Sequence, residues 1–278
     1  MSSQLPKGAA CALLSFLLAA CGSDVELAAG GRAQPIRNGA PPSRPAHDAV
    51  VSLHQRFGAW VWPGSFCSGT LIAPDVVLTA AHCLDVASWG ARDFDEMEPS
   101  ALAVYFGDAP WRDPAPRYVF VDKTRIFPRY DRGAIRNDIA LLRLAEAVSP
   151  SVAEPVPPLP ERRGLIEDDA GVALNFAGFG LDEHGNNDVR LQVDGALAGL
   201  GCAVDGCPHD GDTATQLSYA QGAGGPCFGD SGGPAFLERE DGVFVAGVTS
   251  FGDARCESYG VSTRVDAFGA FLAGFVGR

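Results

Sequence analysis

The sequence predicts an all-β protein, a sandwich or a barrel, that ends in one amphipathic helix. Short runs rich in β-branched residues recur along the chain, each bounded by Pro, Gly or Asp, as in strands separated by tight turns. The 34 Gly and 20 Pro among 278 residues indicate many turns and few long helices. Closely spaced short strands of this kind are typical of antiparallel sandwiches and barrels.

The predicted elements begin at about residue 36. The clearest strand segments are residues 50–54, 71–72, 76–78, 118–121, 139–144, 172–176 and 243–250. The Pro-rich segment 150–160 is interpreted as a crossing between two halves of the chain. Near the end, four apolar residues have the i, i+3, i+4, i+7 spacing of one helix face: Phe268, Phe271, Leu272 and Phe275. We therefore predict a helix from Asp266 to Val276 that packs on the barrel, with Asp266 near its N-terminus.

The N-terminal residues have the pattern of an export signal. Lys7 precedes a twelve-residue apolar run, Ala9 to Ala20, which is too short to span a bilayer. Residues 1–20 are interpreted as a signal peptide and residues 21–35 as a tether or propeptide. The run ends in Leu-Ala-Ala-Cys, which resembles the lipobox of bacterial lipoproteins and implies a lipid on Cys21. The alternative is an ordinary signal peptide with Cys21 in a free tail. We expect an exported chain, either anchored to a bacterial cell envelope by this lipid or secreted after processing.

Charge and cysteine content limit the partners of the chain. The net charge is −13, and Lys and Arg do not cluster with aromatic residues, so no nucleic-acid partner is expected. Without Cys11, in the signal peptide, and Cys21, six of the eight cysteines remain, and an even number in an exported chain indicates three disulfides. Cys202 and Cys207 have no His at metal-binding spacing, so neither a metal nor another cofactor is expected. The alternative is a Ca²⁺ held by the acidic loop of Asp93, Asp95, Glu96 and Glu98, for which a solvated loop is the preferred interpretation.

Three separate segments hold the residue types that acyl transfer requires: Thr79 to Cys83 (TAAHC), Asn137 to Leu142 (NDIALL) and Gly229 to Pro234 (GDSGGP). Taken alone, His82 could be a core histidine and Asp138 a turn residue. Together the segments supply Ser231 as nucleophile, His82 as the base that accepts its proton, and Asp138 to orient the imidazole.

The glycines around Ser231 indicate a tight turn that a substrate carbonyl can approach closely. Such a turn can point the N–H groups of Gly229 and Ser231 at one spot, which would form an oxyanion hole. The spacing Gly229-x-Ser231-x-Gly233 also matches the nucleophile elbow of α/β-hydrolases, in which the acid and the His follow the Ser. All five histidines precede Ser231, so the elbow is excluded.

The motifs TAAHC, NDIALL and GDSGGP, in that order, resemble those of the chymotrypsin/trypsin family of serine peptidases. The resemblance covers about residues 36–278. It implies two six-stranded antiparallel barrels with a C-terminal helix, the crossing between them lying near 150–160. It also implies a monomeric endopeptidase that hydrolyses protein or peptide substrates through an acyl-enzyme, without a cofactor.

The resemblance assigns two disulfides and leaves a third to be inferred. Cys67 and Cys83 resemble the pair beside the catalytic His, and Cys227 and Cys256 the pair beside the specificity pocket. The family's usual pair in the second half is replaced by Cys202 and Cys207, with Tyr219 where one partner is expected. We predict a local Cys202–Cys207 bridge.

The resemblance also implies where the substrate binds. Ser250, Phe251 and Gly252 match the strand that binds the substrate backbone, with Ser250 near the catalytic Asp. Gly225, six residues before Ser231, matches the floor of the specificity pocket, and Gly252 and Gly260 match its walls. An open pocket without charge at its base favours a bulky apolar or aromatic side chain before the cleaved bond. Asp253 at the rim could still attract a basic residue.

Activation is predicted by the same resemblance. In the family, cleavage before an Ile frees an amine that pairs with the Asp preceding the nucleophile, here Asp230. Ile36 and the three residues after it resemble this new N-terminus, but Pro35 precedes it, so a trypsin-type activator would not cut there. The alternative is that Ile36 merely starts a strand. Cleavage before Ile36 would release the enzyme from Cys21. The rival function is a non-catalytic or unactivated binding protein that keeps the fold.

Overall fold

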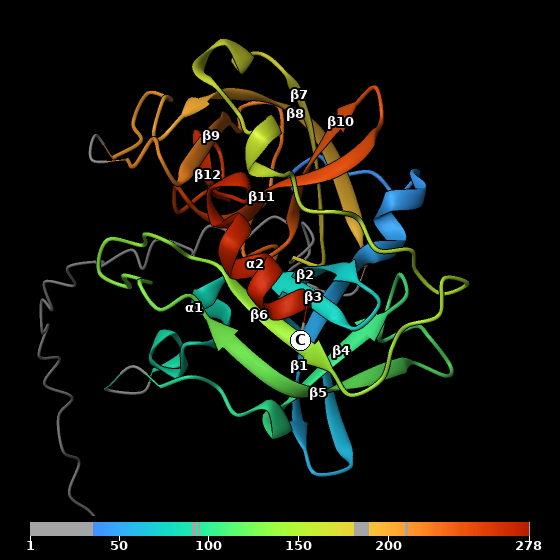
Figure 1. The fold of residues 1–278 in the computed structure, drawn as a ribbon. Helices are drawn as coiled ribbons and strands as arrows, with labels where there is room; N and C mark the ends of the chain where they lie inside the picture. The colour runs from blue at the N-terminus through green and yellow to red at the C-terminus, as the bar shows by residue number, and fades with distance from the viewer. Residues whose placement is uncertain (1–35, 91–92, 94, 181–188, 209–210, 278) are drawn as a thin grey trace, which may run out of the picture. The chain divides into compact units, whose positions relative to one another are not determined.

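Two closed antiparallel barrels of six strands each form the body of the chain, which confirms the predicted fold class (Figure 1). The computed structural model describes residues 36–90, 93, 95–180, 189–208 and 211–277. The signal peptide, Cys21 and the tether all lie outside these residues. No helix within them is long and apolar enough to cross a membrane.

The first barrel contains the strands β1 (Val50–Phe57), β2 (Trp60–Ala73), β3 (Val76–Thr79), β4 (Leu102–Phe106), β5 (Arg117–Ile126) and β6 (Ala140–Leu144). Their order around the barrel is β1-β2-β3-β6-β5-β4, and β1 pairs with β4 to close it. Every residue of β3 and β4 is buried, as expected for strands without a solvent face.

The second barrel contains β7 (Ala173–Gly178), β8 (Leu191–Leu200), β9 (Gln216–Ala220), β10 (Pro234–Arg239), β11 (Gly242–Gly252) and β12 (Tyr259–Arg264). Their order is β10-β11-β12-β9-β8-β7. The rings of Phe176 and Tyr219 lie 4.2 Å apart in its core. Residues 150–160 run from one barrel to the other: Val156 N–H donates to Leu71 of β2, and Leu159 N–H donates to Val245 of β11.

The short helices lie at the margins of the barrels. They are the 3-10 turns η1 (Pro45–Ala49), η2 (Val86–Trp89), η3 (Pro99–Ala101), η4 (Glu161–Arg163), η5 (Glu167–Asp169) and η6 (Asp266–Phe268), and the helices α1 (Ala81–Leu84) and α2 (Gly269–Val276). The predicted C-terminal helix is therefore divided, because its first turn is a 3-10 turn. Asp266 there is buried and accepts hydrogen bonds from Arg264 and from the Leu165 N–H, so it does not cap α2.

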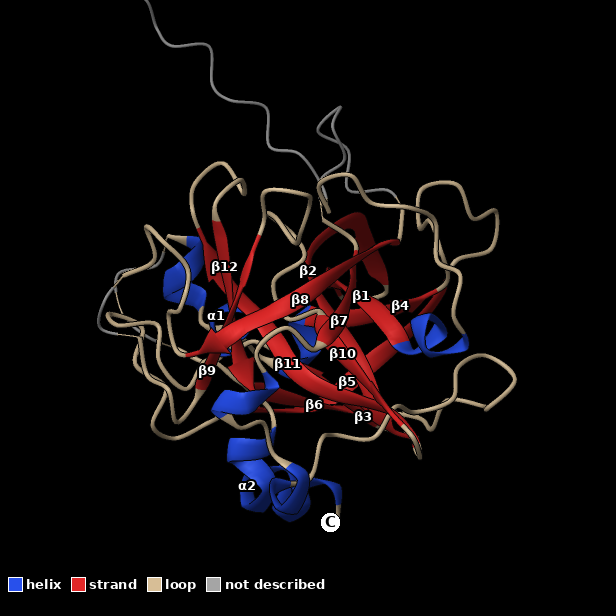
Figure 2. Ribbon diagram, turned by 90° about the horizontal axis from the view of Figure 1, so that it is seen from above, coloured by secondary structure: helices blue, strands red, loops and turns tan. Residues whose placement is uncertain are grey.

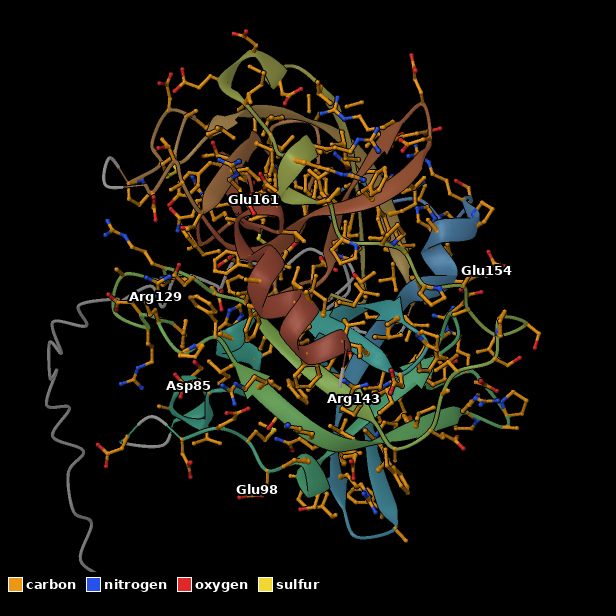
Figure 3. All side chains as sticks on the ribbon, viewed as in Figure 1. Asp85, Glu98, Arg129, Arg143, Glu154 and Glu161 are labelled. Atoms are coloured by element: carbon orange, nitrogen blue, oxygen red, sulfur yellow. A yellow bond between two sulfur atoms is a disulfide. The ribbon has the colours of Figure 1, made fainter. Side chains whose placement is uncertain are left out.

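Helix α2 follows the last strand of the second barrel but packs on the first. Its buried Leu272 and Phe275 belong to the same apolar cluster as the first-barrel core. Arg143 of β6 donates to the carbonyl of Phe275, beside the helix in Figure 3. Figure 1 and Figure 2 together place α2 outside the strands, on the face formed by β6.

A buried arginine links the two barrels. Arg190, just before β8, donates through Nη2 to Asp48 at 3.0 Å and to Asp108 at 2.6 Å, and through Nη1 to the backbone carbonyls of His47 and Val50. Its side chain is only 4% exposed, so two carboxylates balance a charge that would otherwise be costly to bury. These contacts join the segment before β8 of the second barrel to η1, β1 and the loop after β4.

Candidate active site

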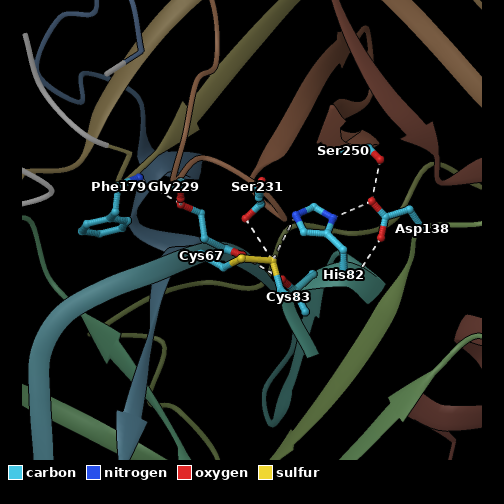
Figure 4. Close-up of a disulfide and its surroundings, with 10 residues drawn as sticks. Cys67, His82, Cys83, Asp138, Phe179, Gly229, Ser231 and Ser250 are labelled. Carbon is cyan, nitrogen blue, oxygen red and sulfur yellow. Dashed lines mark hydrogen bonds and ion pairs between the residues drawn. A yellow bond between two sulfur atoms is a disulfide. The ribbon is translucent and has the colours of Figure 1, made fainter. Parts of the chain in front are cut away.

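The three residues proposed for catalysis come from both barrels (Figure 4). His82 lies on α1, directly after β3, and Asp138 lies in the loop before β6, so both belong to the first barrel. Ser231 lies between β9 and β10 of the second barrel. His82 and Ser231 line the same cleft, and Asp138 is fully buried behind the imidazole.

The carboxylate of Asp138 is held on several sides. It accepts hydrogen bonds from the His82 backbone N–H (2.8 Å, to Oδ1) and from the Ser250 hydroxyl (2.5 Å, to Oδ2), and Oδ2 lies 2.7 Å from His82 Nδ1. The preceding Asn137 adopts a left-handed conformation (φ 54°), which turns the chain so that Asp138 points inward. Burial alone would raise the pKa of Asp138, but the imidazole and these hydrogen bonds outweigh it and hold the pKa below its ordinary value.

The contact between Asp138 and His82 also determines the pKa and the tautomer of the His82 imidazole. Burial would lower the pKa of the imidazole, but the charge of Asp138, its hydrogen bond and the charge of Asp85 together outweigh burial, and the pKa lies above its ordinary value of 6.5. An ionised carboxylate can only accept, so Nδ1 carries the proton and Nε2 is the acceptor. The imidazole is therefore prepared to take a proton through Nε2.

The turn that holds Ser231 is clamped between the barrels. The Ser231 carbonyl accepts from the Ser68 N–H of β2 at 2.8 Å. Gly232 has a left-handed φ of 84°, and a Cβ there would lie 2.2 Å from Thr79 Oγ1 and 2.3 Å from the Ser68 carbonyl, so only glycine fits. The glycines of this segment thus allow close approach between the barrels as well as a tight turn.

The backbone beside Ser231 offers two donors to a substrate. Within the described residues, neither the Gly229 N–H nor the Ser231 N–H donates a hydrogen bond. Gly229 has a left-handed φ of 94°, and its carbonyl is held by the Ser68 hydroxyl at 3.0 Å. The structure records no hydrogen bond between Ser231 Oγ and His82 Nε2 in this part of the chain; in enzymes without substrate this contact is often long.

The cleft has a volume of about 530 Å³. Most of its lining is apolar, and the predicted Ser250, Phe251 and Gly252 are part of it. Gly225 and Gly260 are not. A Cβ on Gly260 would lie 2.3 Å from the ring of Tyr219, and one on Gly225 would lie 2.7 Å from Nε2 of Gln221. The Tyr219 ring itself lines the cleft, so the space that the glycines would leave open is already filled.

Other cleft residues were not predicted. Phe66, Tyr219, Pro226 and Phe228 contribute to the lining from β2, β9 and the segment before Gly229. The signal available in the sequence was the unusual Tyr219, which stands where the family has a cysteine. A large ring that replaces a disulfide sulfur must occupy new space, and here it fills the base of the cleft.

The structure joins Cys67 to Cys83, Cys202 to Cys207 and Cys227 to Cys256, the same pairs as named above. The first borders His82 and the third borders the cleft. Cys67, Cys83 and His82 are the one group of potential metal ligands that comes together in the described residues. Both sulfurs are in a disulfide, so they are not available as thiolates.

Ile36 is buried beside the nucleophile turn. Its side chain is 1% exposed, and its backbone N–H donates to the carboxylate of Asp230. Asp230 also accepts from the Gly180 N–H at 2.8 Å and the Cys227 N–H at 2.9 Å. Complete burial raises the pKa of Asp230 to about 7, although these three donors oppose the rise.

The two barrels, with the Asp138–His82 pair between them, define a serine peptidase. The family model described as Trypsin matches residues 36–272, so the chain belongs to the trypsin family and is a serine endopeptidase. It is similar to chymotrypsin-C of Bos taurus, at 32% identity over 225 residues (73% of this chain, 75% of the relative). It is also similar to brachyurin of Leptuca pugilator, at 32% over 204 residues (69% and 79%). Venom serine protease Bi-VSP of Bombus ignitus is 29% identical over 273 residues (86% and 72%). The family implies a protein or peptide substrate.

Proposed function

We propose that this chain is an exported serine endopeptidase that cleaves peptide bonds through an acyl-enzyme on Ser231. The observation that carries the proposal is the double contact of His82 with Asp138, through its backbone N–H and through Nδ1. This contact fixes both the position and the tautomer of the imidazole, so Nε2 is left to act as the base.

In the proposed mechanism, Ser231 Oγ attacks the substrate carbonyl carbon while its proton passes to His82 Nε2. The oxygen that becomes negative lies near the N–H groups of Gly229 and Ser231, which stabilise it. His82 then protonates the leaving amine, and the peptide bond breaks. A water molecule, deprotonated by His82, hydrolyses the ester and restores Ser231.

We propose that the side chain before the cleaved bond is apolar or aromatic. The cleft is lined by the rings of Phe66, Tyr219, Phe228 and Phe251. Asp253 is the one carboxylate in the described lining, and its oxygens already accept the backbone N–H groups of Arg255 and residues 257–259. A carboxylate so engaged is a weak partner for a basic side chain. The filled base of the cleft favours an apolar group of moderate length over a long basic one.

We propose that cleavage before Ile36 activates the enzyme and separates it from a lipid on Cys21. The new amine would stand where the Ile36 N–H now meets Asp230, and it would supply the positive charge that this buried carboxylate lacks. The chain would then pass from an envelope-anchored form to a secreted one. The three disulfides suit an extracellular protein.

A second candidate is a binding protein that keeps this fold but is never activated. Its support is Pro35, which stands where a trypsin-type activator would need a basic residue. Without cleavage, Asp230 would keep only neutral donors. The first experiment should distinguish these two candidates.

That experiment is a fluorophosphonate reaction followed by intact-mass measurement of the purified protein. We expect a single adduct, carried by a chain that begins at Ile36, because the probe reacts only with an activated serine beside a formed oxyanion hole. Ser231→Ala should abolish the adduct, whereas Ser149→Ala, which alters an exposed serine just before the crossing segment, should keep it. No adduct on any form would favour the unactivated binding protein.

The buried Asp230 predicts an unusual pH dependence of the uncleaved chain. Its folded-state pKa of about 7 lies above the ordinary 3.8, so the folded chain binds this proton more tightly than the unfolded chain does. The free energy of unfolding should therefore rise as pH falls from 8 to 5, by ~2–3 kcal/mol from this group. Denaturant melts of the uncleaved Ser231→Ala chain, with and without Asp230→Asn, measure the contribution.

The matched control for this measurement is Asp168→Asn, which removes an exposed carboxylate of η5. In this variant, the difference in the free energy of unfolding between pH 5 and pH 8 should be the same as in the parent chain. Equal pH dependence with and without Asp230 would contradict the prediction, and would mean that a cation already neutralises this carboxylate.

A further inference from the structure

Four aromatic side chains form an exposed row on the first barrel, which we name the aromatic strip: Phe57, Trp60, Trp62 and Trp111. Three come from the β1–β2 hairpin, blue at the lower edge of Figure 1, and Trp111 comes from the loop after β4. Successive ring centroids lie 5.5, 5.6 and 6.3 Å apart. Each side chain is 47–59% exposed, and together they are four of the seven large apolar residues exposed in the described chain.

The aromatic strip does not belong to the core. None of its four residues is part of the two buried apolar clusters of the described barrels. A continuous exposed patch of large rings costs solubility and is characteristic of a binding surface. The four rings contact one another in succession, so they form one continuous apolar patch.

The strip leads towards the cleft. The indole of Trp62 lies along β2 over Gly64, where a Cβ would be 2.6 Å from Nε1. Two residues further along the strand, Phe66 lines the cleft, and the Ser68 N–H then bonds the Ser231 carbonyl. Two irregularities of the β1–β2 pairing fall along this stretch, one at Phe66 and one at residues 62–64, and such bulges redirect side chains beside active sites.

The position of β2 indicates which part of a substrate would meet the strip. Under the proposed function, the part before the cleaved bond lies against β11, at Ser250 to Gly252. Ser65 and Phe66 of β2 line the cleft from the other barrel, and the segment after the cleaved bond must leave along this side. Ser68 pairs with Ser52 and Trp60 pairs with Phe57, which are five residues apart on β1, so at about 3.3 Å per residue Trp60 lies ~17 Å from Ser68 along the sheet, with Trp62 between them.

We propose that the aromatic strip binds apolar side chains of the substrate about three to five residues after the cleaved bond. The inference rests on the proposed function. That function places the part of the substrate before the cleaved bond against β11, and this fixes the direction in which the part after the cleaved bond leaves. An extended peptide covers the distance from Ser231 to the strip with that number of residues. Shorter peptides would not reach it, so the strip would select long polypeptides with an apolar downstream segment.

The charges beside the strip favour an apolar partner. Arg56 lies 3.6 Å over the ring of Phe120 and donates to the Gly58 carbonyl, and Arg117 pairs with Glu146. These cations are engaged within the chain, whereas binding to an anionic lipid surface or to an acidic segment relies on clustered free cations. Rings that stack on other rings and on apolar side chains give the strip its affinity.

The test compares two peptides that are identical through the second residue after the cleaved bond. One carries Phe at the third and fifth positions, and the other carries Ser there. For the otherwise unaltered chain that begins at Ile36, we expect kcat/KM to be about tenfold higher for the Phe peptide. In Trp60→Ser/Trp62→Ser, and separately in Trp111→Ser, this ratio should fall towards 1. Ile166→Ser, which removes an exposed apolar residue of similar exposure away from the strip, should keep it.

Binding to the full-length Ser231→Ala chain, followed by fluorescence anisotropy, gives a readout that does not require turnover. The Phe peptide should bind about tenfold more weakly when the strip is also replaced, and the Ser peptide should not respond. If the unaltered chain shows neither turnover nor fluorophosphonate labelling, the proposed function is contradicted. The binding difference would still show whether the aromatic strip binds the apolar segment. Equal affinities with and without the strip would overturn the inference. If the strip variants instead lose binding to phosphatidylcholine vesicles, or lose a dimer in sedimentation, the occupant is a lipid surface or a second copy.

Discussion

Replacement of Ser231 by Ala should lower kcat by about 10⁶-fold, the size of loss found when the nucleophile of a serine peptidase triad is removed rather than a value calculated from this structure. The alanine has no oxygen to form the acyl-enzyme, so only the oxyanion donors and substrate binding remain to assist water. The fold should survive, because the contacts that clamp this turn use the backbone of Ser231 and not its hydroxyl.

The measurement uses fluorogenic peptides with Phe or Leu before the cleaved bond, and a matched Arg peptide, on chains that all begin at Ile36. Ser149→Ala serves as the control and should retain full activity, because this serine is exposed and lies just before the crossing segment. KM should change little in Ser231→Ala. Activity within about a hundredfold of the parent in Ser231→Ala would mean that another group is the nucleophile.

Asp138→Asn should lower kcat by about 10⁴-fold, again a magnitude carried over from serine peptidase triads. An amide at this position can donate to Nδ1, which would move the imidazole proton to Nε2 and remove the acceptor that Ser231 needs. Two contacts of the carboxylate favour the wild-type tautomer, the 2.7 Å pair with Nδ1 and the 2.5 Å bond from Ser250. Without the charge of Asp138, burial lowers the pKa of the imidazole and the charge of Asp85 opposes it.

The same variant should change the pH dependence of the activity. Catalysis needs neutral His82, so activity is lost as pH falls through its pKa, which Asp138 holds above 6.5. Removing the carboxylate charge lowers this pKa, and the acid limb of kcat/KM should move to lower pH. Ser250→Ala keeps the charge and should move the limb far less. If the acid limb of the kcat/KM profile keeps its pH in Asp138→Asn, His82 is not the group that titrates there.

The three residues proposed for catalysis could be chosen from the sequence because each lies in a short segment with its own conformational constraints. Gly232 illustrates this: both its left-handed φ and the atoms within 2.3 Å exclude any side chain, so the turn leaves a local signature. The apolar spacing of Phe268, Leu272 and Phe275 similarly predicted a helix, and all three are buried. Its 3-10 first turn escaped prediction because Asp266 bonds Arg264 and Leu165.

Features that depend on distant partners could not be predicted. Arg190 meets Asp48 and Asp108, which are 142 and 82 residues away along the chain, and no local pattern brings them together. The floor of the cleft required knowing that Tyr219 lies against Gly260, across the β9–β12 pair. The aromatic strip likewise becomes visible only when Trp111 is placed beside the hairpin.

The docking of α2 has a consequence for the order in which the protein can mature. Leu272 and Phe275 follow the last strand of the second barrel in sequence, but they are built into the core of the first barrel. The first barrel therefore keeps an open apolar seam until the chain has been synthesised through α2, and pairing over such sequence separation is slow. The two barrels are for this reason expected to mature together, as one cooperative unit and not as two successive halves.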